Sequence, residues 1–131
     1  RYYAMVGLGI DFTARDVQSE LKSKGHPWEK AKGFDGSAVV SHEFMKLMDL
    51  GGDVQNLNFE LKKNGVVVQT GNTRDMIFPV DDLIVYLSKY MTLKTGDLIF
   101  TGTPAGVGAV KKGDLLTGTL EGNHMFDVRV R

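Results

Sequence analysis

The chain has 131 residues, with 16 Lys and Arg, 16 Asp and Glu, and no Cys. A net charge of zero argues against a nucleic-acid binder that works by bulk charge, because a phosphate backbone is normally met by a clear basic excess. The absence of Cys excludes disulfides, thiolate nucleophiles and Cys-ligated metal sites. The length and the 42% hydrophobic content predict one domain, residues 1–131, with a real core.

The first third of the chain predicts a strand followed by a helix. Residues 3–10 are apolar and dotted with Gly, which is typical of a buried strand. Thr13, with Asp16 three residues on, suits the N-cap of a helix that Gly25 and Pro27 end. Residues 28–36 are rich in Gly and charge, and they predict a loop with one helical turn.

The remainder predicts short strands and one further helix. Apolar and polar residues alternate over 57–62, and Asn64 followed by Gly65 indicates a type I′ hairpin into a strand at 66–70. Pro79 and the acidic residues after it open a second helix. Further strands are expected at 97–100, 115–120 and 125–130. The sum is an α+β domain that is mainly β.

The longest apolar runs are short, and the N-terminal residues lead into Asp11 without a small-residue cleavage site. A membrane-spanning helix needs about 20 apolar residues, and a secretory signal needs such a cleavage site. The sequence therefore predicts neither, and we expect a cytoplasmic protein with no membrane or nucleic-acid partner.

Polar residues are concentrated where the first strand gives way to the first helix. Asp11, Arg15 and Gln18 are spaced by four and three residues, and on a helix such spacings share one face. A carboxylate at the end of a buried strand is costly unless it is paired or bound to a metal. These three side chains can therefore converge on one point, although a plain helix cap with a surface Arg fits the same spacing.

Two further segments can carry chemistry. Lys32, flanked by Gly33 and Phe34, can neutralise an enolate or a carboxylate at the rim of a cleft, although it also fits a solvated loop lysine. The Gly-rich run around Thr103 lacks the Gly-Lys-Ser/Thr of a phosphate-binding loop, so nucleotide binding is rejected. Its amides and the Thr103 hydroxyl can hold a carboxylate, although a tight turn between strands fits equally well.

Other side chains are interpreted as structural. The three His residues have no ligand-like spacing and are expected at the surface. Met45 and Met48 are expected on a short apolar helix in the core. The three His are His26, His42 and His124.

Three segments together resemble the C-terminal part of the fumarylacetoacetate hydrolase family. They read GIDFTARDVQ at 9–18, PW at 27–28 leading to KGFDG at 32–36, and GDLIFTGTPAGVG at 96–108. Each piece alone is weak, but their order and spacing agree over nearly the whole chain. The small acylpyruvase and oxaloacetate-decarboxylase-like members are the most similar branch.

The resemblance implies a mixed β-roll or flattened barrel with a few flanking helices, and a homodimer. It also implies Mg²⁺ or Mn²⁺ held by three carboxylates, of which Asp11 is the third. The other two belong to a Glu-x-Glu motif that this sequence lacks, as it lacks the His–Glu pair of the family's lid. Together with Arg1 in place of Met, this leads us to expect a preceding N-terminal portion.

By the same resemblance, Lys32 adds positive charge beside a developing oxyanion, Arg15 and Gln18 orient the substrate, and Thr103 holds a carboxylate. The implied function is a metal-dependent hydrolase or lyase that cleaves C–C bonds of acylpyruvate-like 2-oxo acids through an enolate. An isomerase or hydratase of hydroxymuconate-type substrates and an oxaloacetate decarboxylase use the same enolate and stay open. So does a non-catalytic β-domain used for assembly or ligand binding.

Overall fold

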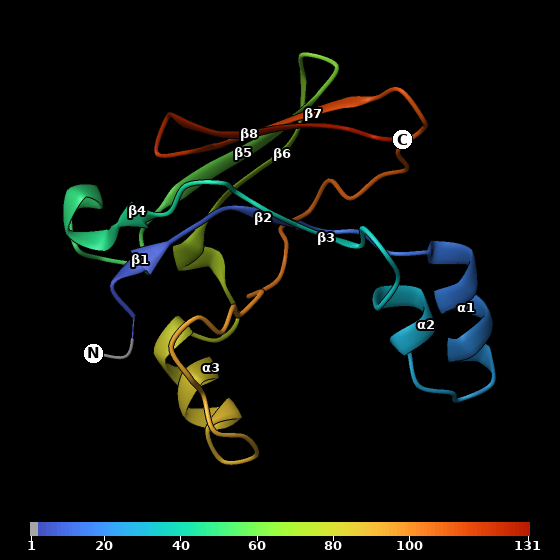
Figure 1. The fold of residues 1–131 in the computed structure, drawn as a ribbon, viewed down its shortest axis with the longest axis horizontal. Helices are drawn as coiled ribbons and strands as arrows, with labels where there is room; N and C mark the ends of the chain where they lie inside the picture. The colour runs from blue at the N-terminus through green and yellow to red at the C-terminus, as the bar shows by residue number, and fades with distance from the viewer. Residues whose placement is uncertain (1–2) are drawn as a thin grey trace.

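Strands form most of the regular structure in the part of the chain that the computed structural model describes, residues 3–131 (Figure 1). Strands β6, β5, β7 and β8 form an antiparallel sheet in that order, and β1–β4 and β2–β3 form two short antiparallel ribbons. Arg1 lies outside the described residues. The elements are β1 (Met5–Val6), β2 (Gly9–Asp11), α1 (Arg15–Ser23), α2 (Glu29–Lys32), β3 (Ala38–Val40), β4 (Met45–Lys46), the 3₁₀ helix η1 (Leu47–Leu50), β5 (Asn58–Lys63), β6 (Val66–Asn72), the 3₁₀ helix η2 (Thr73–Asp75), α3 (Val80–Leu87), β7 (Leu115–Leu120) and β8 (Asn123–Arg129).

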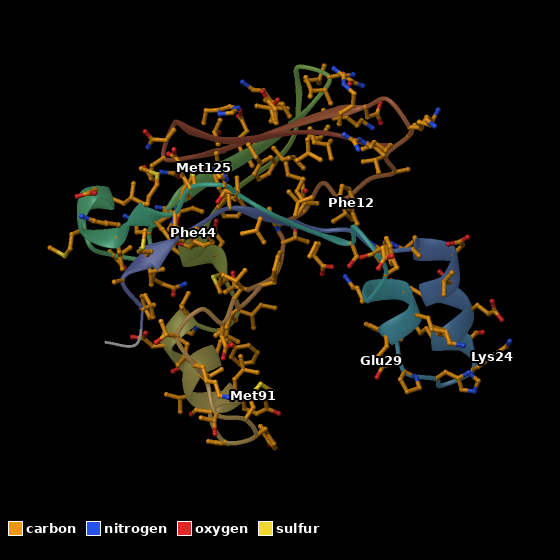
Figure 2. All side chains as sticks on the ribbon, in the orientation of Figure 1. Phe12, Lys24, Glu29, Phe44, Met91 and Met125 are labelled. Carbon is orange, nitrogen blue, oxygen red and sulfur yellow. The ribbon has the colours of Figure 1, made fainter. Side chains whose placement is uncertain are left out.

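The hydrophobic core lies between the four-stranded sheet and the two ribbons. Buried and half-buried residues alternate along β7, so that Leu116 and Leu120 face the interior together. Met125 and Phe126 of β8 join Leu120 in the core cluster, and Figure 2 labels Met125 between the sheet and the β1–β4 ribbon. The predicted α+β domain, mainly β with a few flanking helices, is confirmed.

Three local expectations differ from the structure. Residues 97–100 pair with no strand of the described chain, and the side chains of Leu98 and Phe100 are 54% and 45% exposed. Residues 3–10 form two short strands, β1 and β2, instead of one buried strand. Met48 lies on η1 with 75% of its surface exposed, whereas Met45 packs against the core from β4.

No helix within residues 3–131 combines the length and the apolar character that crossing a membrane requires.

The predicted hairpin at Asn64 and Gly65 is confirmed, and both residues have the positive φ of a type I′ turn (52° and 81°). The Asn64 side chain donates to Asp114 Oδ1 at 2.8 Å and accepts from the Leu115 amide at 2.9 Å. The Asn64 amide, followed by the backbone N–H of Lys111, lowers the pKa of Asp114. Because folding lowers the pKa of Asp114, the ionised carboxylate stabilises the folded state. This contribution to stability is complete at pH values above the ordinary Asp pKa, and it is lost as the pH falls through the lowered pKa.

We expect Asn64→Ala to lower the free energy of unfolding by about 1–2 kcal/mol, because it removes two hydrogen bonds and strains a left-handed residue. Asn64→Gly keeps the left-handed conformation and loses only the hydrogen bonds, so its loss is smaller. Urea unfolding of the two variants measures the difference. Equal stabilities of wild type and both variants would contradict this account of the turn.

The segment that contains Thr103 has no regular secondary structure, but it is docked on β6. A Cβ at Gly71 would lie 3.2 Å from Pro104 Cβ, and one at Gly106 would overlap the backbone oxygen of Val68. On the N-terminal side of Thr103, Phe100 lies against Gly9 of β2, and a Cβ at Gly9 would be 2.8 Å from Phe100 Cε1. Residues 100–106 are therefore held between β2 and β6, and Figure 1 shows this orange segment passing β2.

Gly106→Ala is expected to release this loop from β6. The new Cβ overlaps Val68, and the φ of +98° disfavours any side chain. Cleavage of residues 101–108 by a protease should become faster, and the free energy of unfolding should fall by at least about 1 kcal/mol. Gly108→Ala is the matched control, since a Cβ there meets nothing within 4 Å. Equal cleavage rates of both variants would argue against tight docking.

Candidate functional site

An ion pair lies at the end of the ribbon β2–β3, where helix α1 begins and helix α2 ends (Figure 1). Asp11 is the last residue of β2, and Lys32 is the last residue of α2. Lys32 Nζ donates to Asp11 Oδ2 and to Thr13 Oγ1, both at 2.7 Å. The sequence predicted both Asp11 and Lys32 as site residues without predicting that they meet.

Backbone contacts hold α2 in the place that lets Lys32 reach Asp11. Ala31 is completely buried, and its carbonyl accepts from the Ala14 amide at 3.0 Å. The Phe12 amide donates to the Ser37 carbonyl at 2.7 Å. The segment after β2 is thus tied to the last turn of α2 and to the residues that follow this helix, which Figure 2 locates by the label on Glu29.

The ion pair between Lys32 and Asp11 contributes little to the stability of the fold. The side chains of Lys32 and Asp11 are 37% and 48% exposed, and exposed pairs contribute only about 0–1 kcal/mol. Two of the three ammonium hydrogens of Lys32 are used by Asp11 and Thr13, so one stays available. The arrangement therefore holds the Lys32 ammonium in a fixed position at the surface, with one N–H donor available.

Arg15 and Gln18 lie on the first turns of α1, and Arg15 Nη1 donates to Gln18 Oε1 at 2.6 Å. The prediction that they share a helix face is confirmed. The prediction that Asp11 shares this face by helical spacing is wrong, because Asp11 is in an extended strand and the helix begins only at Arg15. Thr13 is not the N-cap: Ala14 holds that position without a side-chain bond, and the Thr13 hydroxyl accepts from Lys32.

Thr103 lies in the loop docked on β6, and its hydroxyl is contacted by a residue that the sequence did not predict. Gln69 Nε2 donates to Thr103 Oγ1 at 2.9 Å. Gln69 lies in β6 beside a shift in the pairing register with β5, where Leu61 pairs with Gln69 and Lys62 with Val67. No sequence motif around Gln69 singles it out. Only the docking of the loop reveals this contact.

The guanidinium of Arg15 can bind an anionic ligand. Asp11 and Lys32 neutralise each other, and Arg15 adds a second cation whose only hydrogen bond within residues 3–131 is to Gln18. An arginine has five N–H donors in a planar fork that matches a carboxylate. The three predicted His residues are exposed, as expected, and take no part in this region.

The described residues supply one metal ligand at this place. Asp11 Oδ2 accepts from Lys32, while Oδ1 accepts no hydrogen bond within residues 3–131. No group of three or more His, Cys, Asp or Glu side chains in the described chain could hold a metal ion. The chemistry of Asp11 fits a role as one oxygen ligand of a divalent cation, and such a cation would need further oxygen ligands besides those of the described residues.

Comparison with known proteins agrees with these observations. The model of the fumarylacetoacetate (FAA) hydrolase C-terminal family matches residues 3–131. The oxaloacetate tautomerase YcgM of Escherichia coli strain K12 is 48% identical over 124 residues, which cover 95% of this chain and 56% of the relative. The chain thus spans slightly more than half the length of this curated relative.

Solved structures agree in fold. A fumarylacetoacetate hydrolase family protein from Yersinia pestis CO92 superposes with a TM-score of 0.91 at 44% identity, covering 98% of this chain and 59% of that one. The fumarylpyruvate hydrolase of Pseudomonas aeruginosa, solved with Mn²⁺ and pyruvate, has a TM-score of 0.88 at 35% identity, covering 96% and 53%. With its family model matched from residue 3 to residue 131, the chain belongs to the fumarylacetoacetate hydrolase family.

Proposed function

We propose that the full-length protein containing this chain catalyses metal-dependent enolate chemistry on small 2-oxo acids, with the keto–enol tautomerisation of oxaloacetate as its first candidate reaction. The contact of Lys32 with Asp11 and Thr13 is the observation that carries the proposal, because it fixes a cation beside a possible metal ligand. The 48% identity to a protein named oxaloacetate tautomerase supports this choice of substrate.

Tautomerisation breaks a C–H bond at C3 of the oxo acid and leaves negative charge on the C2 oxygen. In the proposed mechanism, the free N–H of Lys32 donates to that oxygen and stabilises the charge as it develops. Asp11 and Thr13 hold the ammonium in place, so no reorganisation is needed during the reaction. Arg15, steadied by Gln18, binds a substrate carboxylate, and Thr103 binds a second one.

Asp11 would hold the divalent cation through Oδ1, and a bound Mg²⁺ or Mn²⁺ supplies Lewis-acid polarisation of the 2-oxo group. The family structure with Mn²⁺ and pyruvate supports a divalent metal. We further propose that a preceding N-terminal portion contributes the missing Glu-x-Glu ligands and the base that takes the C3 proton, and that the protein is a cytoplasmic homodimer.

A second candidate is the hydrolytic cleavage of C–C bonds in acylpyruvates. The 35% identity to a fumarylpyruvate hydrolase favours it, and the same charge on the same oxygen develops in that reaction. The residues of this chain therefore serve either reaction, and product analysis separates them. Cleavage yields pyruvate and a second acid, decarboxylation yields pyruvate and CO₂, and tautomerisation changes only the enol absorbance.

The purified full-length protein is expected to accelerate loss of the oxaloacetate enol with Mg²⁺ or Mn²⁺ and to lose this activity in EDTA. Asp11→Asn should raise the metal concentration for half-activation by roughly tenfold or more, because it removes a charged ligand. Ultraviolet absorbance of the enol and quantification of pyruvate provide the readouts. If no 2-oxo acid is turned over with either metal, the chain is better explained as a non-catalytic domain.

Lys32→Met should lower kcat on the order of 10²-fold, because it removes the donor to the developing oxyanion. Lys32→Arg keeps the charge and should recover part of this loss. Lys30→Met is the matched control, since Lys30 is exposed on the same short helix α2. An equal effect of Lys30→Met and Lys32→Met on kcat would rule out a specific role for Lys32.

A further inference from the structure

One side chain of β6 holds the loop that carries Thr103. Gln69 Nε2 lies 2.9 Å from Thr103 Oγ1, 3.1 Å from the Pro104 carbonyl oxygen and 3.5 Å from that of Ala105. Two of these three atoms are carbonyl oxygens, which only accept hydrogen bonds. The NH₂ group of Gln69 must therefore face the loop. In the opposite orientation, the amide oxygen of Gln69 would face the carbonyl oxygens of Pro104 and Ala105 and be repelled by them.

This orientation decides what the Thr103 hydroxyl can do. A hydroxyl has one hydrogen to donate and two lone pairs that accept. Because Gln69 donates to Oγ1, the hydroxyl hydrogen points elsewhere, and it finds no acceptor within residues 3–131. Thr103 is exposed, so it presents a hydrogen-bond donor to the solvent side of the loop.

The position of that donor is fixed as well as its direction. Pro104 packs on Gly71 and Gly106 packs on Val68, so the loop follows β6 on both sides of Gln69. Upstream, Phe100 packs on Gly9, two residues before Asp11. The donor is therefore anchored to the strand that bears Asp11 as well as to the strand that bears Gln69.

We propose that Gln69 is a positioning residue that turns the Thr103 hydroxyl hydrogen outward, toward the carboxylate of the 2-oxo acid. Gln69 itself does not touch the substrate and acts only through Thr103. This inference rests on the proposed function, because it takes a carboxylate as the group that Thr103 binds. It assigns a specific task to a residue whose strand position alone predicts no role.

Gln69→Glu tests the direction of the hydrogen bond with little change of shape. A carboxylate at 69 accepts the Thr103 hydrogen and repels the carbonyl oxygens of Pro104 and Ala105. In the full-length protein, we expect KM for oxaloacetate and Kd for pyruvate to rise on the order of tenfold, while kcat changes less than about threefold. Thr103→Val should raise the same constants by a similar factor, and Thr70→Val, an exposed neighbour on β6, should not.

The double variant distinguishes two roles of Gln69: orienting the Thr103 hydroxyl, or only supporting the loop. If Gln69 acts through the Thr103 hydroxyl, Gln69→Glu on the Thr103→Val background should raise KM little further. Fully additive effects, or a Gln69→Glu protein with unchanged KM and Kd, would overturn the proposal. The rate of proteolytic cleavage within residues 101–108 of Gln69→Glu shows whether the loop has stayed docked, and Gln69→Asn serves as the second variant if it has not.

Pyruvate binding, titrated by calorimetry with Mn²⁺, keeps this test independent of turnover. A wild-type protein that binds pyruvate but turns over no 2-oxo acid disproves the proposed function, while a weaker Kd in Gln69→Glu still supports the role of Gln69. Normal turnover with no effect of Gln69→Glu disproves the role and leaves the function standing. A wild type that neither binds nor turns over these acids disproves both.

Discussion

The close approach of the N-terminal ribbons to the four-stranded sheet is the constraint on which the site depends. One such contact lies at Gly118 of β7, where a Cβ would be 2.8 Å from Leu8 Cδ2 and would also overlap Phe126 of the neighbouring strand β8. Leu8 directly precedes β2, so the contact between Leu8 and Gly118 positions β2 against the sheet. Because protein interiors are close-packed, a larger residue at 118 would displace the strand that ends in Asp11.

The candidate site is assembled from two parts that are distant in sequence. One is the end of the β2–β3 ribbon, where Asp11, Lys32 and Arg15 combine a carboxylate with two cations. The other is the loop around Thr103, which hydrogen bonds and close packing hold on β6. Phe100 connects the two by packing on Gly9. A rigid scaffold thus positions groups that lie on strand ends and a loop, as is common in enzymes.

Local sequence patterns predicted an element well where its conformation depends on only a few adjacent residues. The turn at Asn64 and Gly65 was confirmed because few other residues tolerate two successive positive φ angles. The cap at Thr13 was wrong because the same hydroxyl had a stronger partner, the ammonium of Lys32, which is 19 residues away. The strand predicted at 97–100 was wrong because these residues find no partner strand in the described chain, and Phe100 instead contacts Gly9 of β2, which no local pattern reveals.

The sequence by itself determined the residue types of the site, their order along the chain and the family to which they belong, because side-chain chemistry and spacing are properties of the chain. The tertiary structure alone decided which of them meet. Asp11 pairs with Lys32 instead of aligning with Arg15, since a strand and not a helix carries it. Gln69 gained its partner Thr103 only when a loop 34 residues away docked on β6, because such contacts depend on packing between distant segments.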